Sequence, residues 1–368
     1  MRQLGAAPSV ALALPLGLMA TAGFLSSAGA RVIVPLLHVI ATDFGTTVPA
    51  TSIVVAAFTL PYGLFQIVLG PLGDRFGKLR LILVMLVAYA GATGACALAG
   101  SLAALTVLRF GAGAASAALI PVSFAAIGDS VPYADRQVTL SRFLTGTVMA
   151  YVLAGPMGGV FGEYLGWRGV FLLLGGTALV LSVAFGWRIR GLPDLRASGS
   201  GLRLSNYLVL AGRSGPRRIL LITAFDGMWM MGCFPFLAPY MHERFGLGYA
   251  AVGLVLACFG LGTLTYTRLA KLLVPWLGEV NMMLSGAVLM AASIGCGVLS
   301  PRWGVFVPAE MGMGLGFYLF HGVLQARATE MLPQARATGV AAFAFMLFLG
   351  QSVGALLIGG LIDALGYC

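Results

Sequence analysis

Eleven long apolar runs follow one another along this chain, separated by shorter segments that carry most of its charge. A helix needs about 20 mostly apolar residues to cross the hydrocarbon core of a bilayer. Backbone polar groups find no water in that core, so runs of this length predict membrane-spanning helices. The expected spans are Leu12–His38, Ala50–Leu69, Leu79–Ala99, Leu102–Ile127, Thr139–Phe161, Gly169–Trp187, Ile219–Tyr240, Ala250–Ala270, Asn281–Leu299, Trp303–Gln325 and Thr338–Ile362.

The composition supports a membrane protein and excludes several other classes. Apolar residue types make up 59% of the chain and charged types 9%, whereas a soluble domain is about one quarter charged. The net charge of +10 does not indicate a nucleic-acid partner, because the basic residues form no stripe with interleaved aromatic residues. The five cysteines show no paired short spacing, so we expect no metal site and no cofactor. The chain is therefore predicted to be an all-α polytopic membrane protein.

The distribution of basic residues predicts the orientation, since Lys and Arg are enriched in cytoplasmic loops. With the N-terminus inside, seventeen of the 22 basic residues lie on the cytoplasmic side, three lie outside and two lie within spans. We therefore expect a multi-pass protein of a bacterial inner membrane with a cytoplasmic N-terminus. The seventeen are Arg2, Arg75, Lys78, Arg80, Arg136, Arg142, Arg188, Arg190, Arg196, Arg203, Arg213, Arg217, Arg218, Arg268, Lys271, Arg327 and Arg336.

A long basic loop divides the chain into two related halves. Residues 188–218 carry seven arginines and are predicted to be a cytoplasmic linker between an N-terminal six-helix bundle, 1–187, and a C-terminal bundle, 219–368. The halves resemble each other at an offset of about 200 residues, as in many transporters. Asp129-Ser-Val-Pro matches Glu330-Met-Leu-Pro, and Glu163-Tyr-Leu-Gly matches Asp363-Ala-Leu-Gly.

The second repeat is shorter than the first. A sixth helix follows Trp167 in the first half, whereas the second half ends one residue after the matching Tyr367. We expect eleven spans, with a C-terminal bundle of five helices and the twelfth helix absent. The sequence is then either truncated or that of a protein that works with eleven helices.

The segment between the second and third spans resembles the loop signature of the major facilitator superfamily. It is Gly70-Pro-Leu-Gly73-Asp74-Arg75-Phe76-Gly77-Lys78-Leu79-Arg80. Glycines permit close helix approach and a tight turn. The resemblance implies two bundles related by a pseudo-twofold axis and an Asp74 that faces the start of the eleventh helix near Thr338, where the helix dipole favours an anion. For Lys78 and Arg80 the alternative is a purely topological role.

Two further motifs resemble sequences of the same superfamily. Arg109, followed by Gly111 and Gly113, resembles its second motif. The segment Gly155-Pro156-Met157-Gly158-Gly159 resembles the glycine-proline motif of antiport-type exporters, although Val160 stands where a further glycine is expected. These motifs imply a bacterial efflux-permease type, whereas the alternative is that the glycines serve only close helix packing.

Five ionisable residues fall inside predicted spans: Arg31, Arg109, Asp226, Glu310 and His321. Such groups are costly in hydrocarbon and usually face a water-filled cavity. The resemblance implies that the first, fourth, seventh and tenth helices line a central cavity, and all five residues lie on those helices. The other expected lining residues are Phe24, Trp229, Met230, Phe234 and Phe317.

The depths of these groups suggest two pairings, Asp226 with His321 and Glu310 with Arg31 or Arg109. Desolvation raises the pKa of a carboxyl group and a nearby cation lowers it, so a carboxyl group that alternates between such surroundings can bind and release a proton. Asp226 and Glu310 are therefore candidates for proton coupling, with His321 as a relay. The alternative is a permanent ion pair that fixes helix packing.

The preferred interpretation is a proton-coupled antiporter that exports a drug-like compound, sugar or other metabolite by alternating access. The alternatives are a symporter or facilitator for a small organic anion, and a truncated homologue that transports nothing. No span carries a metal-binding set or a Ser-His-Asp arrangement, so we expect no enzyme. The expected partners are a small-molecule substrate, protons and the lipid bilayer, with the chain as a monomer. The sign of the substrate's charge is left open, because both arginines and carboxylates are available.

Overall fold

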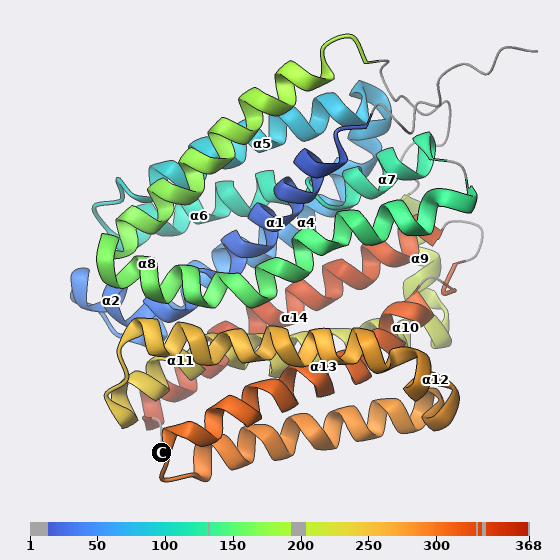
Figure 1. The fold of residues 1–368 in the computed structure, drawn as a ribbon. Coiled ribbons are helices and arrows are strands. Elements are labelled where there is room, and N and C mark those ends of the chain that lie inside the picture. Colours follow the sequence, from blue (N-terminus) through green and yellow to red (C-terminus); the bar gives the residue numbers. More distant parts are fainter. Residues whose placement is uncertain (1–13, 132, 193–203, 329, 333–335, 367–368) are drawn as a thin grey trace, which may run out of the picture.

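The computed structural model describes residues 14–131, 133–192, 204–328, 330–332 and 336–366. These residues are almost entirely helical and contain no strand. The predicted all-α class is therefore confirmed. Figure 1 shows the helices in two groups that lie one above the other, with the first half of the chain in blue to green and the second in yellow to red.

The first half forms six spans from nine segments. The first span is interrupted, the fourth is made of two helices, and α8 supplies the fifth and sixth spans because it bends at Gly166, where φ is 67°. The segments are α1 (Leu16–Arg31), η2 (Val34–Leu36), α2 (Leu37–Asp43), α3 (Val48–Thr51), α4 (Ile53–Phe76), α5 (Lys78–Cys96), α6 (Leu102–Ser116), α7 (Pro121–Ser130) and α8 (Tyr133–Ile189).

The second half forms five spans. Its first span contains a π-helical segment, η3, and its long helix α12 bends at Gly278, where φ is 67°. The segments are α9 (Leu204–Gly212), α10 (Ser214–Asp226), η3 (Gly227–Met231), α11 (Gly232–Phe245), α12 (Tyr249–Leu299), η4 (Trp303–Val305), α13 (Phe306–Ala328) and α14 (Arg336–Leu365).

The described helices agree with the predicted eleven spans. Nine stretches are long and apolar enough to cross a membrane, and one of them, Arg142–Ile189, holds the two arms of α8. The 23-residue α13, which carries Glu310, supplies the remaining span. The limits of the two bundles and of the basic linker stay predictions.

Glycines with positive φ mark the internal repeat in three dimensions. Gly45 and Gly246 have φ of 62° and 66°, and Gly77 and Gly278 have φ of 97° and 67°. Each pair is separated by 201 residues and lies at a turn between helices. Only glycine adopts this backbone region without steric cost, so the two halves reverse direction at equivalent positions for the same reason.

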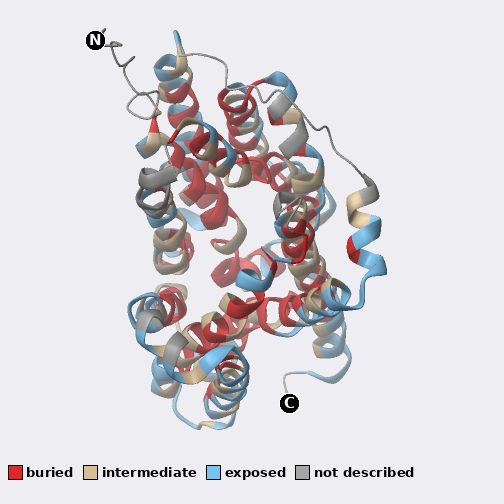
Figure 2. Cartoon of the chain, turned by 90° about the vertical axis from the view of Figure 1, so that its right-hand side faces the viewer, coloured by how far each residue is buried: buried red, intermediate tan, exposed pale blue. Residues whose placement is uncertain are grey.

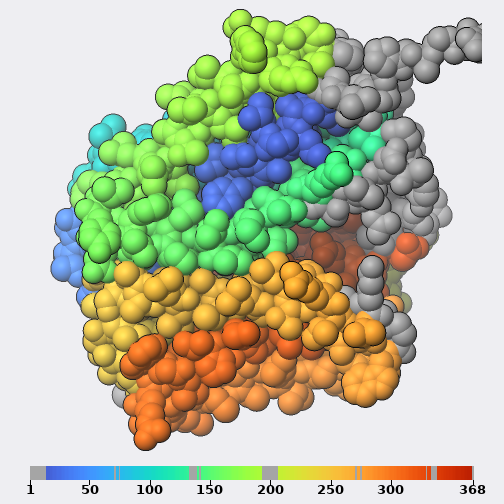
Figure 3. Space-filling view, viewed as in Figure 1, coloured from blue at the N-terminus to red at the C-terminus, as the bar shows by residue number. Residues whose placement is uncertain are grey.

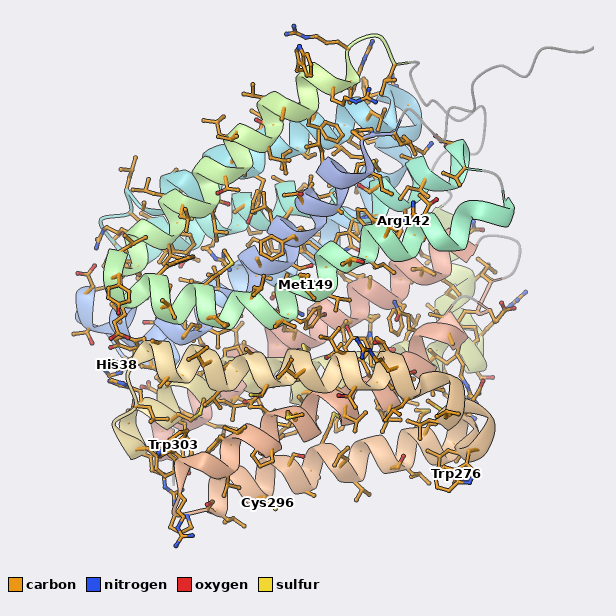
Figure 4. The ribbon with its side chains drawn as sticks, in the orientation of Figure 1. His38, Arg142, Met149, Trp276, Cys296 and Trp303 are labelled. Atoms are coloured by element: carbon orange, nitrogen blue, oxygen red, sulfur yellow. The ribbon has the colours of Figure 1, made fainter. Side chains whose placement is uncertain are left out.

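The outward faces of the helices are apolar. Figure 2 shows buried residues inside the bundles and exposed residues on their outer faces. Leu98, Val180 and Leu299 are at least 71% exposed, a surface that suits lipid rather than water. Figure 4 places Trp276 and Trp303 at opposite ends of the second bundle, which is the arrangement of an aromatic belt at each membrane interface.

Close packing of α6 against α4 requires one glycine of the predicted second motif. A Cβ on Gly113 would overlap the Phe58 carbonyl, whereas a Cβ on Gly111 would meet only the Ala92 Cβ, at 3.8 Å. The two neighbouring glycines therefore differ in their structural role.

We expect Gly113→Ala to destabilise the protein by about 1–3 kcal/mol, the usual cost of overpacking. The matched variant Gly111→Ala should leave stability unchanged or raise it slightly. Thermal unfolding of the purified protein in detergent measures both, and equal melting temperatures for the two variants would contradict this account of the packing.

Candidate functional site

The five ionisable residues predicted inside the membrane lie on α1, α6, α10 and α13, but the structure separates them into distinct environments. Asp226 and His321 contact each other, Arg31 lines a pocket between the bundles, and Glu310 and Arg109 are fully buried. Each environment follows from a particular feature of the helices that hold these residues.

The predicted pair Asp226–His321 is present in the structure. His321 Nδ1 lies 2.9 Å from Asp226 Oδ2, and the two side chains are 9% and 1% exposed. The imidazole stacks on Phe317, with ring centroids 4.7 Å apart, and contacts Phe343 of α14 at 5.1 Å. The pair thus joins α10 to α13 inside the second bundle, within an aromatic enclosure that excludes most water.

A π-helical segment begins immediately after Asp226. Residues 227–231 of η3 widen the helix between α10 and α11, and such segments occur frequently at functional sites. A Cβ on Gly227 would overlap the Leu347 carbonyl, and a Cβ on Gly232 would overlap Gly354. The sequence prediction missed the π-helix; the glycines at both of its ends are the only local signal of its close contact with α14.

Arg31 is the last residue of α1, where the first span is interrupted. Pro35 within η2 has no backbone N–H, so the α-helical hydrogen bonds do not continue through this segment. The Arg31 guanidinium lies 3.8 Å from the centroid of the Tyr151 ring and donates to the Ser27 carbonyl at 3.3 Å. It is partly exposed and forms no ion pair with another described residue.

A pocket between the two bundles opens beside Arg31. Both bundles contribute to its wall, and Arg31 is the only charged residue among the described residues that line it. The lining residues are Arg31, Val34, Tyr151, Ala154, Gly155, Met231, Phe234, Leu256 and Phe259.

Aromatic rings connect this pocket to the Asp226–His321 pair. Tyr151 contacts Tyr318 of α13 at 6.2 Å between ring centroids, and Tyr318 contacts His321 at 6.4 Å. Tyr151 also stacks on Phe259 at 6.2 Å. The sequence prediction missed all three of these aromatic residues, although Tyr318 lies three residues before His321 and therefore on the same face of its helix.

Glu310 lies one turn from the start of α13. Its side chain is 0% exposed, and neither carboxylate oxygen has a hydrogen-bond partner among the described residues. Gly314, one turn further along, packs against the Phe259 carbonyl of α12, and residues four apart share a helix face. Glu310 is therefore turned toward α12 within the second bundle, where the Cys258 thiol lies within electrostatic range.

The predicted pairing of Glu310 with Arg31 or Arg109 is wrong. Rotation of α13 turns Glu310 away from the first bundle, and Arg109 is directed into that bundle. Arg109 donates to the Gly29 carbonyl at 2.8 Å and to the Val54 carbonyl at 3.2 Å.

Arg109 connects three helices of the first bundle rather than lining the pocket. Its side chain is 1% exposed, and its guanidinium lies 4.3 Å from the centroid of the Phe58 ring. The interruption of α1 leaves the Gly29 carbonyl available as an acceptor, so the break in the first span also creates the binding position for this arginine.

The five apolar residues predicted to line the central cavity lie in several different parts of the structure. Phe234 lines the pocket beside Arg31, and Phe24 packs near the small residues of α1 and α8. Met230 and Phe317 belong to the core of the second bundle. Trp229 is 48% exposed and lies with Leu357 and Leu361 of α14 in a separate surface pocket.

A buried lysine of the loop motif forms an ion pair with α7. Gly77 ends α4 with φ of 97°, and Lys78 begins α5 with its Nζ 2.7 Å from Asp129 Oδ2. The Lys78 side chain is 3% exposed, so its role is not topological alone. The side chain of Asp74 lies outside the described part of the chain, and its contact with the start of the eleventh span stays a prediction.

The other motif residues differ from Lys78 in their exposure. Arg75 and Arg80 are exposed, and the Arg75 guanidinium lies 5.4 Å from the centroid of the Phe76 ring. Gly73 packs near Val122 of α7. The surroundings of Gly70, like the side chain of Asp74, lie outside the description.

The second repeat has a related ion pair with reversed charges. Gly278 and Glu279 lie between the two arms of α12, at the positions equivalent to Gly77 and Lys78, and Arg327 donates to Glu279 at 2.6 and 2.8 Å. In each half, a residue at the start of one span thus forms an ion pair with a residue at the end of the following span. Both residues lie at the same end of the bundle.

The glycine-proline motif brings α8 close to α12. A Cβ on Gly155 would overlap the Gly253 carbonyl, and one on Gly159 would overlap the Tyr249 carbonyl. Pro156 lies within α8 between them. The motif therefore allows two helices from different bundles to pack backbone to backbone.

Further contacts close the same end of the molecule, which the basic residues predict to be the outer end. Glu163 of α8 accepts from the Ala250 amide at the start of α12 at 3.1 Å. His38, labelled in Figure 4, lies between the bundles. The centroid of its ring is 4.6 Å from that of His242, and its Nδ1 is 3.9 Å from Glu243 Oε1.

The opposite end of the molecule is hollowed between the beginning of α8 and α12, and part of α14 is visible at the bottom of the hollow (Figure 3).

Comparison with known proteins gives the family. The family model of the Major Facilitator Superfamily matches residues 19–355. The chain belongs to this superfamily. YceJ, an MFS-type transporter of Bacillus subtilis (strain 168), is 24% identical over 337 residues, which cover 90% of this chain and 84% of that protein. YwfA, another MFS-type transporter of Bacillus subtilis (strain 168), is 23% identical and covers 97% of this chain and 86% of its own length.

A solved structure supports the fold of this superfamily member. A bacterial homologue of the human lysosomal transporter Spinster, in an inward-facing and unoccupied conformation, superposes with a TM-score of 0.78 at 20% identity. The match covers 96% of this chain and 82% of that one. The chain thus has the fold of the major facilitator superfamily, a family of membrane transporters in which enzymes are not typical.

We expect Arg109→Lys to destabilise the protein by about 1–3 kcal/mol. The single ammonium group of a lysine lacks the planar fork of N–H groups with which Arg109 donates to the Gly29 and Val54 carbonyls. Arg31→Lys, which changes an arginine at the pocket wall, should leave the melting temperature within error of the unchanged protein. Thermal unfolding in detergent compares them. Equal destabilisation by both variants would contradict the distinction between a structural and a pocket arginine.

Reversal of the Lys78 charge tests the ion pair of the loop motif. Lys78→Glu places a carboxylate beside Asp129 and should destabilise the protein by about 2 kcal/mol, less than a fully buried pair because Asp129 stays half exposed. The second change Asp129→Lys, made in the same chain, should restore most of that loss. A double variant no more stable than the single variant in thermal unfolding would show that the pair contributes little.

Proposed function

We propose that this transporter exports a small organic molecule in exchange for protons, by alternating access between the two bundles. The observation that carries the proposal is the enclosed Asp226–His321 pair, which connects by aromatic contacts to the pocket between the bundles. A pair that shares one proton in a nearly dry site changes its charge when that proton leaves. Such a change alters the cost of keeping the pair buried and therefore favours one arrangement of the helices over another.

Glu310 is proposed as a second proton-binding group. A charged carboxylate without a partner or water would be very costly in this position, so the surroundings favour the neutral acid. Ionisation requires access to water, which a rearrangement of α13 against α12 provides. Protonation of Glu310 is thereby coupled to the conformation of the second bundle.

Export is proposed from the glycine-proline motif in α8, which resembles that of antiport-type exporters and here packs against α12. The second candidate function is proton-driven uptake of a small organic anion, which is favoured by the presence of Arg31 at the pocket wall without an ionic partner among the described residues.

Transport into membrane vesicles separates the two candidates. For an exporter, inside-out vesicles acidified in the lumen should accumulate substrate, because protons leave the lumen as substrate enters. For a symporter, accumulation should require the opposite gradient. A screen in which no compound is transported under either gradient would contradict both candidate functions and favour a chain that does not transport.

We expect Asp226→Asn and Glu310→Gln to reduce gradient-driven accumulation at least tenfold while retaining gradient-independent counterflow. The amides keep the shape of the side chains but cannot exchange a proton, so coupling is lost before binding. Glu279→Gln, which removes a carboxylate that is 54% exposed at the inner end, is the matched control and should accumulate substrate normally. Proton-driven transport at the normal level by both Asp226→Asn and Glu310→Gln would exclude these residues from coupling.

A further inference from the structure

We infer that the pocket between the bundles selects a monoanionic, largely apolar organic acid, and that Arg31 binds its acidic group. This inference rests on the proposed function of the pocket as a substrate site and specifies the substrate class. It also gives a sign to the charge of the substrate, which the sequence leaves open.

The charge balance at the pocket is the first observation. Four of the five ionisable groups within the spans are withdrawn from its wall: Asp226 is bound by His321, and Glu310 and Arg109 are at most 1% exposed. Of the residues that the structure describes, Arg31 is the one charged residue that lines the pocket. The wall of the pocket therefore carries a positive charge that no described carboxylate compensates.

The hydrogen-bonding capacity of Arg31 is the second observation. A guanidinium has five N–H donors in a fixed fork, and here one of them donates to Ser27, at 3.3 Å. The contact with the Tyr151 ring at 3.8 Å covers one face of the guanidinium and limits its orientation. An oriented fork with unused donors suits the two oxygens of a carboxylate.

The rest of the pocket wall determines which chemical groups the ligand can carry besides its acidic group. Val34, Met231, Phe234, Leu256 and Phe259 supply an apolar surface from both bundles. A neutral sugar needs several hydrogen-bonding groups along its length, whereas this wall supplies few. A phosphate or a di- or tricarboxylate would bring more negative charge than one arginine compensates. An aromatic or branched aliphatic monocarboxylate matches both parts of the pocket.

The position of the pocket gives the binding a role in transport. Arg31 and Tyr151 belong to the first bundle, whereas Phe234 and Phe259 belong to the second. A ligand that contacts both groups connects the two bundles. The pocket encloses about 30 Å³ in this conformation, so an aromatic or branched aliphatic acid requires the bundles to move apart around it. Such a ligand also lies at the start of the aromatic path that leads through Tyr318 to His321.

Binding of matched probes to the purified full chain in detergent, measured by isothermal titration calorimetry, tests the inference. The probes are 2-naphthoate, its neutral isostere 2-naphthamide, and citrate. We expect saturable binding of 2-naphthoate, at least tenfold weaker binding of 2-naphthamide, and no detectable binding of citrate. The difference between acid and amide corresponds to one charge-assisted hydrogen-bonded contact.

Variants assign the selectivity to its residues. Arg31→Gln should bind the acid and the amide equally, and Phe259→Ala should weaken both by a similar factor. Arg302→Gln, which changes an exposed arginine in the segment between α12 and η4 that does not line the pocket, is the matched control and should bind like the unchanged protein. Equal affinity of the unchanged protein for acid and amide, an acid preference that survives in Arg31→Gln, or an absence of binding by all three probes would each overturn the inference.

These binding measurements need no proton gradient, so they fail independently of the proposed function. Loss of proton-driven transport in Asp226→Asn together with equal binding of acid and amide would retain the transporter and reject the substrate class. Selective binding of 2-naphthoate without proton-driven transport of any compound would retain the anion site and reject proton coupling.

Discussion

The cost of placing charge in hydrocarbon governs the interior of this transporter. Each ionisable group within the spans meets that cost in a different way. Asp226 has His321 as a partner, Arg109 has two backbone carbonyls, and Arg31 has the face of an aromatic ring and an open pocket. Glu310 has none of these partners among the described residues, so it is the group whose charge would be least compensated where it lies.

Interruptions of the helices supply the polar groups and the space that these residues need. The break in the first span leaves the Gly29 carbonyl for Arg109 and brings Arg31 to the pocket wall. The π-helix after Asp226 widens the seventh span beside the glycines that meet α14. In a membrane such irregular backbone is tolerated only where protein or water satisfies it, so its presence beside the charged residues links local structure to the site.

The two repeats make different kinds of contact at the two ends of the molecule. At the predicted outer end, α8 and α12 approach through Gly155 and Gly159, and Glu163 accepts from the first turn of α12. At the other end, each half has its own ion pair, Lys78–Asp129 or Glu279–Arg327, within one bundle. Contacts between the bundles thus close the predicted outer end, whereas each of these two ion pairs lies within one bundle.

The sequence by itself determined the membrane class, the eleven spans and the superfamily resemblance, because apolar length, basic loops and a glycine-rich motif are properties of consecutive residues. Depth, together with the cavity-lining helices that the resemblance implies, also suggested the Asp226–His321 pair. Only the tertiary structure decided that Glu310 faces α12 and that Arg109 serves the interior of its own bundle, since helix rotation is set by packing between distant segments. The aromatic path through Tyr151 and Tyr318 was equally invisible, because its rings meet only when the two bundles pack together.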